Sequence, residues 1–480
     1  LTFANFFMER MKSFSLYRDL YQYPQQQPNN THSFFEKEKE IRATLTQLKW
    51  KRFFEAVQKD HAMLNKKIDQ QLDQLEQLYQ TYQRDFPMHY AAKMQLDFKP
   101  IETSLSLLRQ PKHQSKTIVQ FAQTKDALFT LLLRKDTCIF LKTPKDDLFN
   151  NNVLEFQEQL SQSHLIGVDS FYQEFTQRSH QLYQKLWAPI APFLPRASQI
   201  ILIPDGALSQ LPFEVLIRQS PTKDTKINYK KLDYLVKEWT IEYATSLKTY
   251  LYKTQNQSPL PSSPKILAFA DAKNSQSKKG IFALRDSSLS RLPGSERELL
   301  AIQQLYGTKE NHFFFGEESN QKNFRRYSQQ AFDILHLALH AKADETHWLK
   351  SKLYLRQAQS KASKNNRHDP ILGHELSNLN LSIPLVVLSA CQTAKGIEFV
   401  GEGTQSLARA FLKAGTGKVI SSFWNINDHT TSELISYFYH HLKASHNITT
   451  ALTKAKLDYL NKKDDYLSFP GFWAALICLN

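Results

Sequence analysis

The sequence contains no long hydrophobic run. Its longest apolar stretches, such as residues 383–391, fall well short of the roughly 18 residues that a membrane-spanning helix requires. The composition therefore predicts a soluble globular protein without a membrane span. The sequence begins at Leu1 rather than Met. We therefore expect it to be an excised or processed piece whose original N-terminus and any targeting signal lie outside it.

Cysteine is also scarce. Only Cys138, Cys391 and Cys478 occur among the 480 residues, and they lie far apart. An odd number of widely spaced cysteines argues against a disulfide framework and favours a reducing compartment. We therefore expect a cytoplasmic protein.

The sequence has no basic arm, although its formal net charge is +15. The excess of lysine and arginine is spread along the chain, and no nucleic-acid-binding motif or basic stripe interleaved with aromatic residues is present. Nucleic acid is therefore expected to be an indirect partner at most. The one dense basic run, from Lys350 to Arg367, fits either a solvated loop or a contact surface for an acidic partner.

The N-terminal part, residues 1–115, has the pattern of a helical region. Residues Ser33 to Arg84 include no proline or glycine, and their apolar residues follow one helical stripe. This long helix or helical hairpin is too polar to form a buried core alone, so we expect it to pack on a neighbouring domain or to bind a regulatory protein partner. The region suits the end of an upstream repeat array, although no repeat period is visible within the chain.

The rest of the chain alternates short apolar runs with amphipathic segments. In residues 116–264, Asp126 to Leu141 predicts a strand hairpin that turns at Lys135. Residues 265–480 predict a mostly parallel sheet flanked by helices, which is an α/β fold. The strands expected in this last part are Ile266–Ala270, Phe313–Phe315, Asp333–Leu337, Pro384–Ala390, Val419–Phe423 and Phe472–Leu479.

Two of these strands end at residues that are suited to catalysis. His340 follows one buried strand and Cys391 follows another. Ligands bind at the carboxyl ends of strands in open α/β sheets, and an imidazole activates a neighbouring thiol as a nucleophile. A cysteine that ends an apolar strand is also often a small buried hydrophobe. His336 and His340 are four residues apart, a metal-ligand spacing only in a helix, so we expect no metal or cofactor and interpret His336 as a core histidine.

Several motifs resemble the CHAT family, a bacterial relative of caspases and separases. The strongest matches are the histidine motif Leu335–His340 and the cysteine motif Val387–Thr393. Further segments match in family order up to the C-terminus: Ile200–Gly206, Leu211–Glu214, Leu292–Glu298, Gly401–Gly403, Arg409–Phe411, Ser422–Asp428 and Pro470–Ala475. The resemblance implies a caspase-like fold.

The resemblance also implies roles for individual residues. Cys391 becomes the nucleophile, His340 the general acid and base, and the backbone N–H near Ala341 part of an oxyanion hole. The family usually has glycine at the position of Ala341. Asp428 either lines a specificity pocket for a basic side chain or caps the helix that starts near His429, and Glu402 is similarly ambiguous.

We therefore predict a cysteine endopeptidase that cleaves a specific protein partner and is activated by a partner or signal. The family resemblance places such proteins in bacterial antiviral defence, beside gasdermin-like or CRISPR-linked systems. The alternative is a CHAT fold that has lost cleavage and serves as an interaction scaffold.

Overall fold

The computed structural model describes residues 101–221, 226–256, 259–271, 292–344, 350–356, 368–390, 393, 397–399, 403–425 and 428–480, with single positions between 37 and 84. The chain divides into two compact units, one of residues 15–99 and one made mainly of residues 100–480. Within the smaller unit the described residues between 37 and 84 are helical. This agrees with the helical pattern expected there. Among the described residues no helix has the length and apolarity needed to cross a membrane.

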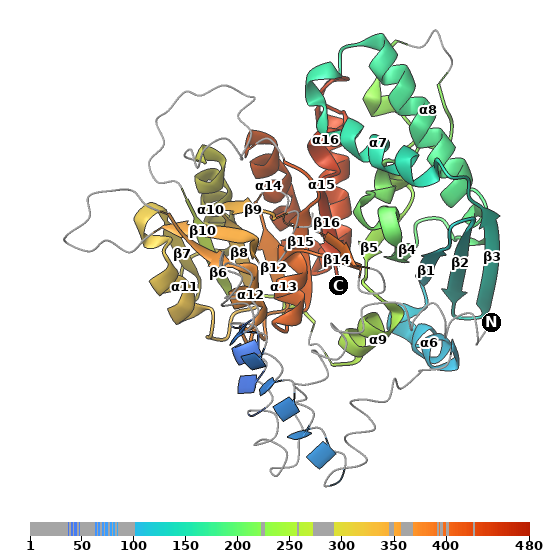
Figure 1. Ribbon diagram of the computed structural model, residues 1–480. Helices are drawn as coiled ribbons and strands as arrows, with labels where there is room; N and C mark the ends of the chain where they lie inside the picture. The colour runs from blue at the N-terminus through green and yellow to red at the C-terminus, as the bar shows by residue number, and fades with distance from the viewer. Residues whose placement is uncertain are drawn as a thin grey trace. The chain divides into compact units, whose positions relative to one another are not determined.

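One sheet of eleven strands forms the centre of the larger unit (Figure 1). Its order is β3-β2-β1-β4-β5-β16-β15-β12-β8-β6-β7. The strands are β1 (Lys116–Gln123), β2 (Ala127–Arg134), β3 (Thr137–Pro144), β4 (Gln199–Ile203), β5 (Thr240–Tyr243), β6 (Ile266–Ala270), β7 (His312–Phe315), β8 (Ile334–Ala338), β12 (Leu385–Leu388), β15 (Lys418–Ser422) and β16 (Leu476–Leu479). The pairings are parallel except for β1–β2, β2–β3 and β15–β16.

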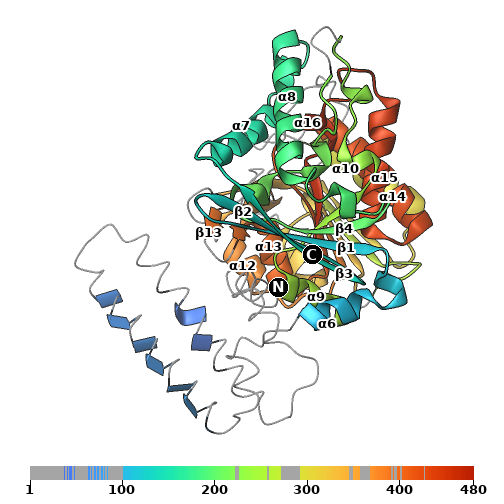
Figure 2. The ribbon, with the colours of Figure 1, turned by 90° about the vertical axis from the view of Figure 1, so that its right-hand side faces the viewer.

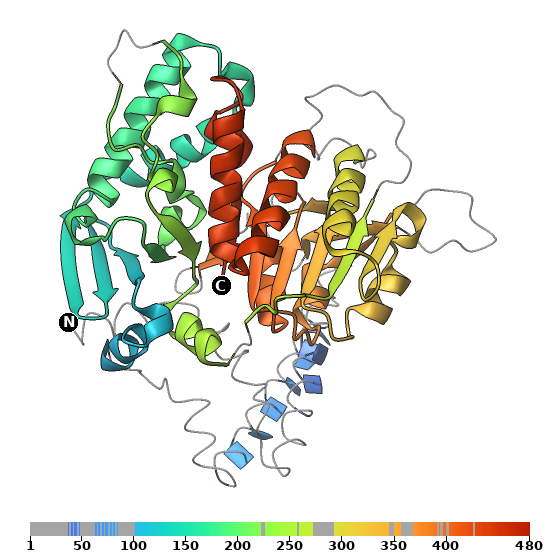
Figure 3. The same cartoon turned by 180° about the vertical axis from the view of Figure 1, so that it is seen from behind.

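Helices cover both faces of this sheet (Figures 2 and 3). The helices are α6 (Ile101–Leu108), α7 (Phe149–Ser161), α8 (Asp169–Leu186), α9 (Leu247–Asn256), α10 (Pro293–Tyr306), α11 (Gln321–Tyr327), α12 (Gly373–Ser377), α13 (Leu407–Lys413), α14 (Asp428–Ser445), α15 (Ile448–Lys462) and α16 (Pro470–Trp473). Every residue of β6, β8 and β12 is buried. Strands that are covered on both faces have apolar residues at nearly every position, so these strands are easily recognised in the sequence.

Smaller strands extend from the sheet. A three-stranded sheet has the order β11-β10-β9, with β9 (His340–Lys342), β10 (Lys352–Arg356) and β11 (His368–Leu372). A two-stranded hairpin pairs β13 (Ile397–Phe399) with β14 (Gly403–Gln405). Because β9 begins two residues after β8 ends, the small sheet lies next to the end of a central strand.

Most of the predicted elements are confirmed, with two corrections. The hairpin turn at Lys135 joins β2 to β3 as expected. The strand predicted over Phe472–Leu479 is wrong in its first half, where Pro470 opens the short helix α16, because proline suits the first turn of a helix. The basic run from Lys350 to Arg367 is not all loop, since Lys352–Arg356 forms β10.

The two halves of the large sheet meet at β5 and β16 through a short contact. Leu479 pairs with Tyr243, and the Asn480 backbone N–H donates to the Tyr243 carbonyl at 2.8 Å. The strands of the first half, β1, β4 and β5, run antiparallel to β15, β12 and β8, because β16 is parallel to β5 and antiparallel to β15. The backbone pairing at this seam is therefore slight, and side chains supply further contacts.

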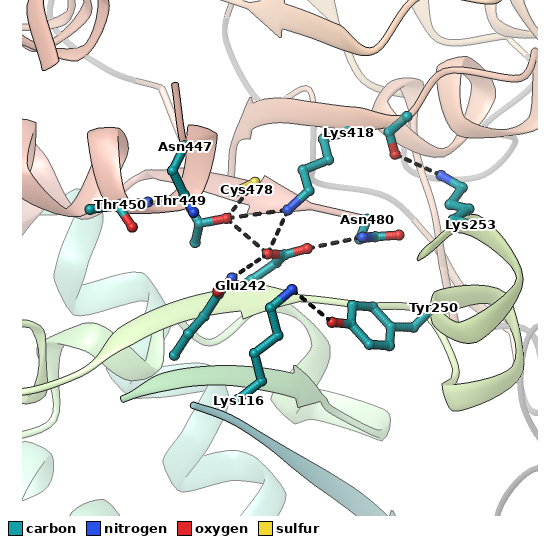
Figure 4. A network of polar contacts seen from close by, with 12 residues as sticks. Lys116, Glu242, Tyr250, Lys253, Lys418, Asn447, Thr449, Thr450, Cys478 and Asn480 are labelled. Carbon is teal, nitrogen blue, oxygen red and sulfur yellow. Dashed lines mark hydrogen bonds and ion pairs between the residues drawn. The ribbon is translucent and has the colours of Figure 1, made fainter. Parts of the chain in front are cut away.

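A buried carboxylate, Glu242 on β5, carries these contacts (Figure 4). Its oxygens lie 2.6 Å from Lys418 Nζ on β15 and accept from Asn480 Nδ2 at 2.9 Å and from Thr449 Oγ1 at 2.8 Å. Burial alone would raise the pKa of Glu242, yet the ammonium groups of Lys418 and Lys116 lower that pKa to about 2. Glu242 is therefore an ionised group that links both halves of the sheet.

Replacing this carboxylate should destabilise the whole fold. We expect Glu242→Gln to lower the free energy of unfolding at pH 7 by about 3–5 kcal/mol, because it replaces a fully buried carboxylate and leaves the partly buried Lys418 ammonium beside a neutral amide. Urea denaturation measures the change. As a control, Asp136→Asn removes the exposed carboxylate beside Lys135, and we expect it to cost less than about 1 kcal/mol.

The pH dependence of stability in wild type and in Glu242→Gln tests the same role of Glu242. The folded-state pKa of Glu242, about 2, lies below its ordinary value of 4.5. The carboxylate therefore contributes its full stabilisation above pH 4.5 and loses it as the pH falls towards 2. The stability difference between wild type and Glu242→Gln should shrink over this window, and a constant difference would contradict the role assigned to Glu242.

Candidate active site

Three neighbouring parallel strands end at the same edge of the sheet. Strand β8 lies between β6 and β12, with Ala338 paired to Ala270 of β6 and Leu337 paired to Leu388 of β12. The residues that follow these strands are therefore close neighbours, since adjacent strands are about 4.8 Å apart. Asp271 follows β6, and His340 lies two residues after β8.

His340 is almost completely buried at this edge. Its side chain is 3% exposed, and its Nε2 atom lies 3.8 Å from Oδ2 of Asp271, whose side chain is 1% exposed. This separation is longer than a hydrogen bond but within the range of an ion pair when the imidazole is protonated. His340 is part of the histidine motif in the sequence, whereas Asp271 lies outside all of the family motifs.

Arg356 holds Asp271 in place. Its Nε atom lies 2.8 Å from Asp271 Oδ1, and one of its terminal nitrogens donates to the Asp271 carbonyl at 3.3 Å. The Arg356 backbone N–H donates to the Ser319 carbonyl at 2.9 Å. One guanidinium group thus fixes both the side chain and the backbone of Asp271, and the other carboxylate oxygen remains on the side of His340.

Cys391 lies outside the described residues, but residues on either side of it are well anchored. The Ala390 carbonyl accepts from Ser422 Oγ at 2.7 Å, and Thr393 Oγ1 accepts from the Ser422 N–H at 3.1 Å. The Ala408 N–H donates to the Thr393 carbonyl at 3.0 Å. The segment after β12 is therefore tied to the end of β15 and to α13.

His336 is a core histidine, as predicted from the sequence. Its ring is fully buried, with Nε2 3.1 Å from Glu298 Oε2 and Nδ1 3.1 Å from the Tyr439 hydroxyl. These partners belong to α10 and α14, so the ring joins β8 to two helices that cover the sheet. The contacts of His336 are therefore with the covering helices, which fits a structural role.

The remaining candidates differ in how far the structure describes them. Ala341 lies on β9, buried and paired with Leu353 of β10. Asp428 is the first residue of α14, and its carboxylate accepts a short hydrogen bond from the Gly294 backbone N–H at the start of α10. Glu402 lies outside the described residues. The structure thus gives Asp428 a partner at a helix N-terminus, where a carboxylate is favourable.

Neither described cysteine has the environment of a nucleophile. Cys138 is half-buried on β3, and Cys478 is buried on β16. Burial raises the pKa of the Cys478 thiol to about 11, so this thiol stays protonated at neutral pH. Across the described part of the chain, histidine, cysteine, aspartate and glutamate side chains form no group of three or more that would hold a metal ion.

Comparison with known proteins identifies the class. Residues 176–480 match the CHAT domain, which is more than half of the chain, so this protein belongs to the CHAT domain family. Its fold is a mixed α/β structure with a mostly parallel sheet flanked by helices. A search of curated proteins found no match.

Two solved structures are similar to this chain. The Saccharomyces cerevisiae separase–securin complex matches with a TM-score of 0.48 and 10% identity, over 79% of this chain and 31% of the other. A complex of Porphyromonas gingivalis RgpB pro- and mature domains matches with a TM-score of 0.35 and 13% identity, over 70% of this chain and 75% of the other. This chain spans about a third of the length of the separase chain.

The structure also shows what sequence reasoning missed. Asp271 follows the apolar run Ile266–Ala270 directly, so the rule that pointed to His340 and Cys391 would also have pointed to Asp271. Arg356 carried no comparable signal, because it stands within the basic run and its role depends on pairing between β9 and β10.

The assignment of His336 to the core predicts a stability effect. We expect His336→Ala to lower the free energy of unfolding by about 2–4 kcal/mol, because it removes the imidazole that contacts the buried Glu298 carboxylate and leaves a cavity. Urea denaturation compares it with His164→Ala, a change at an exposed histidine that should be nearly neutral. Equal stability of the two variants would contradict the structural role of His336.

Proposed function

We propose that the protein is a cysteine endopeptidase in which His340 and Cys391 form the catalytic pair. The observation that carries this proposal is the position of β8 beside β12, with His340 after one strand and Ala390, the residue before Cys391, after the other. Membership of the CHAT domain family supports it, because Leu335–His340 and Val387–Thr393 resemble the family's histidine and cysteine motifs and both lie within the matched residues 176–480.

The chemistry follows from these two groups. The imidazole of His340 accepts the thiol proton, and the Cys391 thiolate attacks the carbonyl carbon of a peptide bond. Backbone N–H groups near Ala341 and Cys391 stabilise the oxyanion that forms. The imidazolium then protonates the leaving amine, the C–N bond breaks, and water hydrolyses the thioester to release the acid and restore the thiol.

We infer that the substrate is a protein, because the catalytic pair is suited to cleaving a peptide bond. For Asp428 we favour a structural role over a place in a specificity pocket, because the Gly294 N–H donates to its carboxylate. Glu402 remains the candidate for a specificity pocket. The helical region within residues 1–115 is proposed to bind a regulatory protein that activates cleavage. The proposed biological role of this cleavage is bacterial antiviral defence.

Substitution of either catalytic residue tests the proposal. We expect Cys391→Ala and His340→Ala each to lower peptide cleavage by about 10⁴-fold or more, and the double variant to lose little further, because the two residues act as a unit. The measurement is mass spectrometry of a proteome-derived peptide library incubated with each purified full-length protein.

The control is His164→Ala, which should cleave the library as wild type does. Circular dichroism establishes that the inactive variants are folded. Cleavage by Cys391→Ala at the wild-type rate would contradict the proposed nucleophile. A wild-type protein that cleaves nothing, even with a bound protein partner, would favour the interaction scaffold.

A further inference from the structure

Asp271, Arg356 and His340 form a cluster of charged and ionisable side chains after β6 and β8. Of these three residues, only His340 belongs to the proposed catalytic pair. We propose that Asp271 is a positioning residue that orients the His340 imidazole and stabilises its protonated form, and that Arg356 holds Asp271 for this purpose. The inference rests on the proposed function, since it concerns how His340 serves Cys391.

The geometry assigns one ring nitrogen to Asp271. The Oδ2 atom of Asp271 lies 3.8 Å from His340 Nε2, with both side chains almost fully buried. The hydrogen bond made by one imidazole nitrogen sets which tautomer the ring adopts. An Nε2–H directed at Asp271 leaves Nδ1 as the acceptor for the thiol proton. The separation of 3.8 Å is longer than a hydrogen bond, and in the proposal it shortens to one when substrate binds, as catalytic hydrogen bonds that are long in the free enzyme often do.

Arg356 stabilises the buried carboxylate of Asp271. A buried carboxylate without a partner is strongly unfavourable, and the contact of 2.8 Å between Arg356 Nε and Asp271 Oδ1 compensates it. The second contact, from the guanidinium to the Asp271 carbonyl, prevents the group from turning. Arg356 thus fixes which oxygen faces His340.

Backbone pairing between strands fixes the positions of these residues. Residues Tyr354 and His340 are paired between β10 and β9, so the strand that carries Arg356 is the one bonded to His340. Asp271 donates its backbone N–H to the Ala338 carbonyl at 3.3 Å, which continues the β6–β8 pairing to the same edge. Both partners of the ion pair are therefore fixed to the strands beside His340.

The expected effect is on the ionisation of Cys391. Among the described residues, the carboxylate of Asp271 after β6 lies 3.8 Å from His340 Nε2 and Arg356 on β10 contacts that carboxylate, while Lys342 on β9 is exposed. A carboxylate near the imidazolium favours the thiolate–imidazolium pair, so the thiol becomes reactive at a lower pH. A neutral side chain at position 271 should raise that pH.

The experiment follows alkylation of Cys391 by iodoacetamide between pH 4 and 10, with mass spectrometry of the full-length protein. We expect Asp271→Asn to shift the midpoint of the reactivity curve upward by about 1 pH unit. Glu214→Gln is the matched control, because it removes another buried carboxylate, paired with Lys456 at 2.9 Å. This control should lose stability without shifting the curve.

The outcomes separate the inference from the proposed function. A wild-type Cys391 that reacts as an ordinary thiol, whether or not His340 is replaced by alanine, would overturn both. A wild-type curve that depends on His340 but not on Asp271 would overturn the positioning role alone and leave Asp271 as a structural partner of Arg356.

A second measurement applies if Asp271→Asn does not fold. In the unmodified protein, ¹⁵N resonances of the histidine rings report the tautomer of His340 at a pH where the ring is neutral, with His340→Gln used to assign the signal. We expect the Nε2–H tautomer. The Nδ1–H tautomer would overturn the inference.

Discussion

The active-site geometry depends on one constraint, the parallel pairing of β8 between β6 and β12. Because the three strands run in the same direction and in register, their carboxyl ends meet at one edge of the sheet. That edge receives Asp271, His340 and the segment that leads into Cys391. A shift of β8 by one residue would turn His340 to the other face and separate it from Asp271.

The seam between the two halves of the sheet supports this arrangement. Strand β15 pairs with β12 at its centre, contacts Glu242 through Lys418 at its start, and ends at Ser422, which bonds the Ala390 carbonyl. One strand thus connects the buried Glu242 contacts to the residue before Cys391. An ionised group at the seam is tolerated because several partners from both halves surround it.

Much of this fold is predictable from the sequence because β6, β8 and β12 are apolar throughout. The same pattern explains why His340 is predictable, since it is the polar residue after such a run. Asp271 meets the same criterion but lies outside the motifs that resemble the family, so no motif marks it as a site residue. Arg356 and the Glu242 contacts join residues that are far apart in the chain, and no local pattern of charge or hydropathy reveals such pairs.

The most direct test of the central claim is the site of thiol modification in the native protein. Brief treatment with a low concentration of iodoacetamide at pH 7, followed by peptide mapping, compares Cys391 with Cys138 and Cys478 in wild type and in His340→Ala. The account predicts that Cys391 is labelled first in wild type and loses this preference in His340→Ala, because a low-pKa thiolate reacts fastest. Labelling of Cys138 ahead of Cys391 in the wild-type protein would contradict the account.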